Sequence, residues 1–291
     1  MSNIIIAVRN ENGVIEPDSI QNIEEWKNGE KNSKILIKKS GVKLFKILQE
    51  DLNYIQLNDK GIFELKYILN NNIEETVMRL MGNIAEAIVV SRCNESKKRN
   101  RRYATIARKG KRVVKTPDKY IAIGTGHFKT KKMFSSKYNP QHTQHDIIWI
   151  NKKNPEKELL EVDSNKISGK TAALQIKASS FNSEYVYKEI KKDKYKVPLV
   201  YFGMRDNYYK ILKKLKGYNA KINFYDKFID IREIDEDAYD EFFEYKSLIK
   251  KLLAGKISPV DLLDSKDIIQ KSALKTTLTS YVNKSIILPT A

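Results

Sequence analysis

The sequence predicts an α/β chain of the α+β kind, with a mixed central β-sheet flanked by helices. Two observations lead to this prediction. Over residues 73–230, short apolar runs of strand length alternate with amphipathic stretches of helical period. The chain has 291 residues, of which 41% are hydrophobic, enough to bury a substantial core. We expect an N-terminal α/β subdomain at residues 1–72, this core at 73–230, and a helical C-terminal extension at 231–291.

The N-terminal subdomain carries mixed signals. Residues 4–8 have the composition of a strand, and 19–26 and 42–48 have helical spacing. The segment 52–69 passes through a turn into a further predicted helix. Two helices around a turn, with lysines on the exposed face, are compatible with a small winged-helix-like DNA reader. We favour a subdomain that serves packing only, because a fold by itself does not imply function.

Residues 73–93 form the most regular predicted helix. Its buried stripe recurs at helical spacing and consists of Ile73, Val77, Leu80, Met81, Ile84 and Ile88. Glu86 falls off this stripe. Gly82 lies one turn before Glu86 on the same side, where its missing side chain lets another backbone approach closely. Glu86 is thus either a solvated surface carboxylate or a contributor to a site beside the helix.

The later elements alternate between strands and helices. Apolar runs predict strands at residues 120–123, 146–150, 172–178, 197–202 and 222–225. Helices are predicted at residues 182–192, 207–216, 235–253, from 258 onward and at 267–281. The predicted helix at 235–253 has acidic residues in its N-terminal half and basic residues near its C-terminus, an arrangement that complements the helix dipole. Gly255 is expected to end this helix. The helical tail is a candidate dimerisation element.

The charge balance indicates a polyanionic partner. Lys and Arg number 54 against 36 Asp and Glu, a formal charge of +18. The most basic segments, 97–102 and 108–112, are typical of phosphate contacts, which position a nucleic acid without reading its sequence. No apolar run approaches the roughly 20 residues that span a bilayer, so we expect no membrane partner. The single cysteine, Cys93, excludes an internal disulfide and favours a cytoplasmic location.

The strongest functional signal lies on two predicted strands. Asp146 opens one apolar strand, and the next strand carries Gln175 and Lys177. Because side chains alternate across a strand, Gln175 and Lys177 leave on one face while Ile176 packs on the other. One face therefore carries an oxygen ligand and a cation side by side.

This arrangement suits the hydrolysis of a phosphodiester. Mg²⁺ prefers hard oxygen ligands, takes one or two carboxylates, and leaves its other positions to water and phosphate. A nearby ammonium holds the nucleophile and offsets charge in the transition state. Asp146 is the predicted anchoring ligand, Gln175 a neutral oxygen ligand, the Ile176 carbonyl a further ligand, and Lys177 the cation. Mn²⁺ is expected to substitute for Mg²⁺.

These residues resemble the motif of the PD-(D/E)xK nuclease superfamily, which includes restriction endonucleases, resolvases and repair nucleases. His145-Asp146 stands where the family has Pro-Asp, and Gln175-Ile176-Lys177 stands where it has Glu-x-Lys. Some restriction-type members carry Gln at that position. The resemblance covers roughly residues 73–203. It implies a restriction-endonuclease-like core, a metal-site glutamate at Glu86, double-stranded DNA as substrate, and a homodimer that cuts both strands.

Two alternatives for the site remain open. Asp163 lies nearer Gln175 in the sequence and can replace Asp146 as the motif aspartate, although the residues after it have turn character. The second alternative is a dedicated histidine metal site. All three histidines, His127, His142 and His145, closely precede Asp146 in the sequence. A His-Asp pair is also typical of helical HD-type phosphohydrolases. The residues after Asp146 have strand character, which favours the nuclease motif.

We therefore expect a Mg²⁺-dependent DNA endonuclease (a hydrolase), of the type II restriction or phage-defence kind. One alternative is a resolvase or repair nuclease that reads DNA structure. Another is a non-catalytic nucleic-acid-binding regulator, in which the motif is coincidental. Incubation of a long duplex with Mg²⁺ separates them, because discrete bands mean sequence-specific cutting and a smear means nonspecific or structure-guided cutting.

Overall fold

A computed structural model describes residues 5–6, 8–9, 21–22, 36–67, 73–163, 166–179, 183–203, 205–219, 223–263 and 286–287. Contacts divide the chain into two compact units. Unit 1 comprises Met1–Gln49, Tyr54–Tyr67 and Ser247–Ala291, and unit 2 comprises Glu50–Asn53 and Ile68–Lys246.

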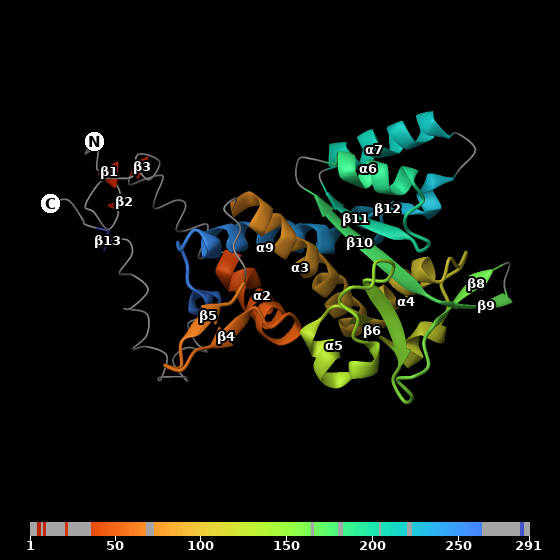
Figure 1. Cartoon of the computed structure of the whole chain (residues 1–291), viewed down its shortest axis with the longest axis horizontal. Coiled ribbons are helices and arrows are strands. Elements are labelled where there is room, and N and C mark those ends of the chain that lie inside the picture. The colour runs from red at the N-terminus through yellow and green to blue at the C-terminus, as the bar shows by residue number, and fades with distance from the viewer. Residues whose placement is uncertain are drawn as a thin grey trace. The chain divides into compact units, whose positions relative to one another are not determined.

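A mixed five-stranded sheet forms the centre of unit 2 among the described residues (Figure 1). Its order is β12-β11-β10-β7-β6. β7 pairs antiparallel with both β6 and β10, whereas β10, β11 and β12 are parallel. The strands are β6 (Tyr120–Gly124), β7 (Ile147–Asn151), β10 (Ala173–Ser179), β11 (Leu199–Gly203) and β12 (Phe228–Asp230). The predicted mixed sheet is confirmed, and four of these strands begin within two residues of their predicted starts.

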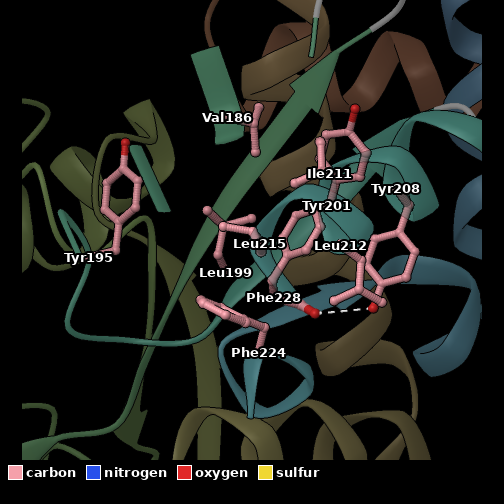
Figure 2. Close-up of a cluster of buried hydrophobic side chains, with 10 residues drawn as sticks. All are labelled: Val186, Tyr195, Leu199, Tyr201, Tyr208, Ile211, Leu212, Leu215, Phe224 and Phe228. Atoms are coloured by element: carbon pink, nitrogen blue, oxygen red, sulfur yellow. Dashed lines mark hydrogen bonds between the residues drawn. The ribbon is translucent and has the colours of Figure 1, made fainter. Parts of the chain in front are cut away.

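Helices α6 (Glu184–Lys191) and α7 (Arg205–Tyr218) cover one face of the sheet. Leu199 and Tyr201, alternate residues of β11, point into the apolar cluster buried under these helices (Figure 2). Tyr208 of α7 donates its hydroxyl to the carbonyl of Phe228 at 3.2 Å, which joins the helix to β12. Phe202, the residue after Tyr201, points to the opposite face and packs against Phe242 of α9 (Glu236–Leu253), with ring centroids 5.2 Å apart.

Helix α3 (Ile73–Glu95) packs against β6 and β10. Its predicted stripe is fully buried wherever side chains are described, at Val77, Leu80, Met81, Ile84 and Ile88. Near its C-terminus, Arg92 donates hydrogen bonds to Asp235 at 3.2 Å and to Glu241 at 2.6 Å. A buried ion pair offsets the cost of desolvating its charges only when the two groups are held in a favourable geometry. These contacts therefore fix the orientation of α3 relative to α9.

Helix α4 (Lys97–Ala107) is held to the sheet through one buried amide. The side chain of Asn100 accepts a hydrogen bond from Nε1 of Trp149 at 2.7 Å and donates to the carbonyl of Pro117 at 2.8 Å. Trp149 is the largest fully buried side chain of β7. Loss of the amide would leave a buried indole N–H without an acceptor.

We expect Asn100→Ala to lower the free energy of unfolding by about 2 kcal/mol, the cost of leaving buried polar groups unpaired. Asn94→Ala is the matched control, because Asn94 is exposed and also bonds to backbone, donating to and accepting from Ala122 at 2.9 and 3.0 Å. Its expected loss is under about 1 kcal/mol, since water replaces the lost partner. Urea unfolding of both variants is the measurement. Equal losses would contradict the structural role given to Asn100.

Unit 1 contains a helical segment followed by a hairpin. The helical segment is η2 (Ile37–Gly41), α2 (Val42–Lys46) and η3 (Ile47–Asp51), of which Glu50 and Asp51 are assigned to unit 2, and the hairpin is β4 (Ile55–Leu57) with β5 (Phe63–Leu65). Phe45 and Phe63 meet edge to face at 5.0 Å. Gly41 is required by close packing, because an added Cβ would lie 2.4 Å from the carbonyl oxygen of Leu262 in η7 (Pro259–Leu262).

Three local predictions are wrong at described residues. The helix predicted at the end of 52–69 is the β4–β5 hairpin, because Gly61 takes a positive φ of 72° and Asn58 accepts hydrogen bonds from the amides of Lys60 and Ile62. No helix-turn-helix pair is present there. Within the helix predicted at 19–26, the described residues form strand β3 (Gln21–Asn22). In place of the strand predicted at 222–225, a 3₁₀ turn, η6 (Phe224–Asp226), begins after the capping residue Asn223.

The remaining elements are short. They are β1 (Ile5–Ile6), β2 (Val8–Arg9), β13 (Ile286–Ile287), η4 (Thr116–Lys119), α5 (Phe128–Met133), η5 (Ser135–Lys137), β8 (Leu160–Asp163), β9 (Lys166–Thr171) and α8 (Ile231–Ile234). The helix predicted at 267–281 lies outside the described residues. In the part of the chain that the structure describes, no helix combines the length and apolar character needed to span a bilayer.

Candidate functional site

Asp146 and Gln175 lie side by side where β7 and β10 stop pairing. The ladder ends at Ile147 and Leu174, and the next residue on each strand is a site residue. Nε2 of Gln175 donates to Oδ2 of Asp146 at 2.5 Å, and the amide of Ile176 donates to the same oxygen at 2.7 Å. Oδ1 of Asp146 is left without a donor among the described residues. One carboxylate oxygen is therefore fixed to β10 and the other is free to bind a ligand.

Thr125 fixes the backbone of Asp146 from the other side. Its amide donates to the carbonyl of Asp146 at 2.9 Å, and its hydroxyl donates to the carbonyl of His145 at 2.5 Å. Thr125 is itself buried. The Gly124-Thr125-Gly126 sequence, too short for a nucleotide-binding pattern, thus positions the aspartate. Sequence reasoning missed this role, and no local pattern signals it.

The side-chain oxygen of Gln175 is buried without a partner. Gln175 is 5% exposed, its amide nitrogen bonds to Asp146, and Oε1 has no hydrogen-bond partner among the described residues. An unpaired buried amide oxygen costs about 1–3 kcal/mol, so its presence calls for a function. An amide oxygen is a hard, neutral ligand of the kind that a divalent cation accepts beside a carboxylate. The residues present therefore fit a divalent cation next to Asp146.

Glu86 of α3 joins this pair, although its position on the helix did not distinguish a site residue from a solvated one. Its side chain is 18% exposed. Burial raises the pKa of Glu86 to about 8, against the opposing charge of Lys177. Burial and, second to it, the charge of Glu86 raise the pKa of Asp146 to about 7. When both are deprotonated, these two half-buried carboxylates repel each other, which is the condition that a bound cation relieves.

Lys177 lies within the electrostatic range of both carboxylates, because its charge lowers the pKa of Glu86 and of Asp146. Its Nζ is 3.7 Å from Oε2 of Glu189 and 5.1 Å from the centre of the Tyr195 ring. The side chain is 23% exposed, so the ammonium is neither buried nor neutralised by a tight pair. Glu189 and Tyr195, which share a 2.8 Å hydrogen bond, are site neighbours that the sequence did not reveal.

The alternative aspartate, Asp163, lies elsewhere. It ends strand β8 and is exposed, and it pairs in register with Lys166 of β9 in a separate two-stranded sheet. Asp146, by contrast, contacts Gln175 directly. The geometry thus groups Asp146, and not Asp163, with Gln175.

The histidines do not form a site of their own. The rings of His142 and His145 stack at 4.3 Å, and Nδ1 of His142 accepts the amide of His145 at 3.0 Å, which orders the loop before β7. Within the described ranges, no group of three or more His, Cys, Asp and Glu side chains is placed to hold a metal ion. A cation site here consequently depends on the amide of Gln175 in addition to the carboxylates of Asp146 and Glu86.

The ring of His127 lies beside the carboxylate of Glu86. Its Nε2 lies 3.6 Å from Oε2 of Glu86, and the ring is buried without a hydrogen bond to Nε2 among the described residues. Burial lowers the pKa of His127 to about 4, so the ring is neutral at pH 7. Gly124 makes room for it, since an added Cβ would lie 2.4 Å from Nε2.

The basic segment 97–112 divides into two parts. The arginines of its first part form contacts within the protein: Arg99 with Asp235 and Asp237, Arg101 with Asp118, and Arg102 with the carbonyl of Glu233. These three guanidinium groups therefore make contacts within the protein that their charge alone did not predict. The second part, from Lys111 onward, is exposed.

Comparisons with family models, with curated proteins and with solved structures found no match to this chain.

Proposed function

We propose that this protein is a metal-dependent DNA endonuclease of the restriction or phage-defence kind, with a restriction-endonuclease-like core in unit 2. Asp146, Gln175 and Glu86 would hold the cation, with the carbonyl of Ile176 as a further ligand. The observation that carries the proposal combines the contact of Asp146 with Gln175, a buried Gln175 oxygen that has no hydrogen-bond partner among the described residues, and the charges of Glu86 and Lys177, which both act on Asp146.

The ligand chemistry favours Mg²⁺, with Mn²⁺ as a substitute. Two carboxylates and an amide oxygen are hard donors, and Mg²⁺ binds through one or two carboxylates while keeping several waters. When bound, such an ion polarises the phosphate and acidifies a water molecule. Gln175 contributes its dipole without a charge, so Glu86 supplies the second negative charge that the site needs.

Lys177 provides the positive charge beside the reacting phosphate. Its ammonium donates hydrogen bonds to a water nucleophile or to a phosphate oxygen, where it offsets the charge of the transition state. Glu189, at 3.7 Å, is too distant for a hydrogen bond and leaves these donors available. The ring of Tyr195 limits the positions that the long side chain can adopt. The strongly positive chain attracts the DNA polyanion.

The test is incubation of the purified protein with a long mixed-sequence duplex, with a branched duplex and with a plasmid, in Mg²⁺ and in EDTA. We expect cleavage of the unbranched duplex that requires Mg²⁺, and discrete bands for a restriction-type enzyme. Preferential cutting of branched DNA would instead identify a resolvase or repair nuclease. Tight DNA binding with no cutting in Mg²⁺ or Mn²⁺ would refute the nuclease and leave a regulator.

A further inference from the structure

Strands β8 and β9 form a ribbon that stands apart from the central sheet, at the start of β10 (Figure 1). Every residue of β9 is exposed or only half-buried, and β8 is its one partner strand in the described part of the chain. Ile167, at 71% exposure, is the most exposed large hydrophobic residue whose burial is described. A strand with this much exposed surface does not contribute to the core.

The base of the ribbon is nevertheless firmly built. The hydroxyl of Thr171 donates to Glu158 at 2.5 Å, and Lys137 donates to the other oxygen of Glu158 at 2.8 Å. The amide of Ala172 donates to the carbonyl of Leu159 at 2.7 Å. The ribbon therefore projects from a fixed base, directly before the strand that carries Gln175 and Lys177.

Arg108 and Lys109, which directly precede the exposed second part of the basic segment, are attached to this ribbon. The amide of Val162 donates to the carbonyl of Arg108 at 2.8 Å, and Nε of Arg108 donates to the carbonyl of Leu160 at 3.1 Å. Lys109 forms an ion pair with Glu161 at 2.7 Å. The loop 110–116 and the ribbon thus belong to one continuous surface.

Five lysine and arginine side chains on this surface form no ion pair with a described residue. Among the described residues, no ion pair is formed by Lys111, Arg112, Lys115, Lys166 or Lys170, and all five are exposed. This contrasts with the arginines of α4, which are paired within the protein. Exposed cations without an internal partner release counterions when they meet phosphates, which is the main source of affinity for DNA.

We propose that the β8–β9 ribbon and the loop 110–116 are the surface that binds duplex DNA, with the ribbon entering a groove and Lys166 and Lys170 contacting phosphates. The proposal rests on the proposed function for its partner. A two-stranded ribbon fits the major groove, which is roughly 12 Å wide, and an exposed aliphatic side chain such as Ile167 can contact a thymine methyl group. The chain from Lys170 to Gln175 spans at most about 17 Å at 3.3 Å per residue, so one duplex can reach both ribbon and site.

The experiment is DNA binding by Lys166→Ala/Lys170→Ala, measured in EDTA by fluorescence anisotropy of a 30-base-pair duplex over a range of salt concentrations. We expect about tenfold weaker binding near physiological salt and a salt-dependence slope smaller by about 2, one for each lost phosphate contact. Lys210→Ala/Lys213→Ala on α7 is the matched control, since both lysines are exposed, and we expect it to bind like the wild type. Lys166→Arg/Lys170→Arg keeps the charges and should restore the slope.

Wild-type affinity and slope in the alanine variant would overturn the ribbon proposal while leaving the nuclease proposal intact. Ribbon-dependent binding by a protein that never cuts DNA would support the ribbon and refute the nuclease. A wild-type protein that fails to bind any duplex would overturn both.

Discussion

Lys177→Met is expected to reduce DNA cleavage by on the order of 10²–10³-fold, and Asp146→Asn by at least as much, with little change in DNA affinity. Lys177 stabilises charge that develops only in the transition state, and one such donor is worth about 10²–10³ in rate. Asp146→Asn removes one of two carboxylates from the site, so the cation is lost as well. The measurement is single-turnover cleavage of a duplex in Mg²⁺, together with its binding in EDTA.

Lys194→Met is the matched control for Lys177→Met. Both lysines lie near Glu189 and over the ring of Tyr195, but Lys194 is more exposed and exerts no resolved effect on the two carboxylates. We expect this variant to cut at close to the wild-type rate. Full activity in Lys177→Met or in Asp146→Asn would end the assignment of the site.

The local pattern of the sequence was sufficient to predict four of the five strands of the sheet, and it favoured Asp146 over Asp163 as the partner of Gln175. Alternation along β10 places Gln175 and Lys177 on one face, and the apolar run after Asp146 requires a strand. Both features depend on neighbours in sequence. The α3 helix was equally predictable, because its buried stripe repeats over several turns.

The remainder of the site depends on contacts between distant segments. Thr125 and His127 approach Asp146 and Glu86 because β6 pairs with β7, and nothing near these residues in the sequence signals that contact. Whether Glu86 faces solvent or the site depends on how α3 lies on β6 and β10. The arginines of α4 were predicted to bind phosphate from their charge alone, yet their acidic partners include Asp235 and Asp237, more than 130 residues away.

The two raised carboxyl pKa values predict opposite effects of pH on the metal-free and metal-bound protein. The pKa values of Glu86 and Asp146, about 8 and about 7, exceed their ordinary values of 4.5 and 3.8. The folded state therefore binds more protons than the unfolded state between these limits. The resulting stabilisation is complete below about pH 4 and is lost as pH rises through 7 and 8.

We expect the free energy of unfolding in EDTA to fall by on the order of 5 kcal/mol between pH 5.5 and 8.5 because of this pair. Mg²⁺ binds the deprotonated carboxylates, so the stabilisation that it adds should grow over the same interval. Urea unfolding at several pH values, with and without Mg²⁺, measures both effects. Neither measurement depends on DNA cleavage.

The Glu86→Gln variant tests whether the Glu86–Asp146 pair, and not other titrating groups, causes this pH dependence. The amide is neutral at every pH, and without the charge of Glu86 the pKa of Asp146 should move down. The variant should therefore be more stable than the wild type in EDTA at pH 8.5, gain little from Mg²⁺, and cut DNA poorly. Such a gain in stability with a loss of function is expected where buried like charges are kept for binding a cation. An identical pH profile in the variant would show that Glu86 and Asp146 do not share a site, and the proposed metal centre would then lose its second carboxylate.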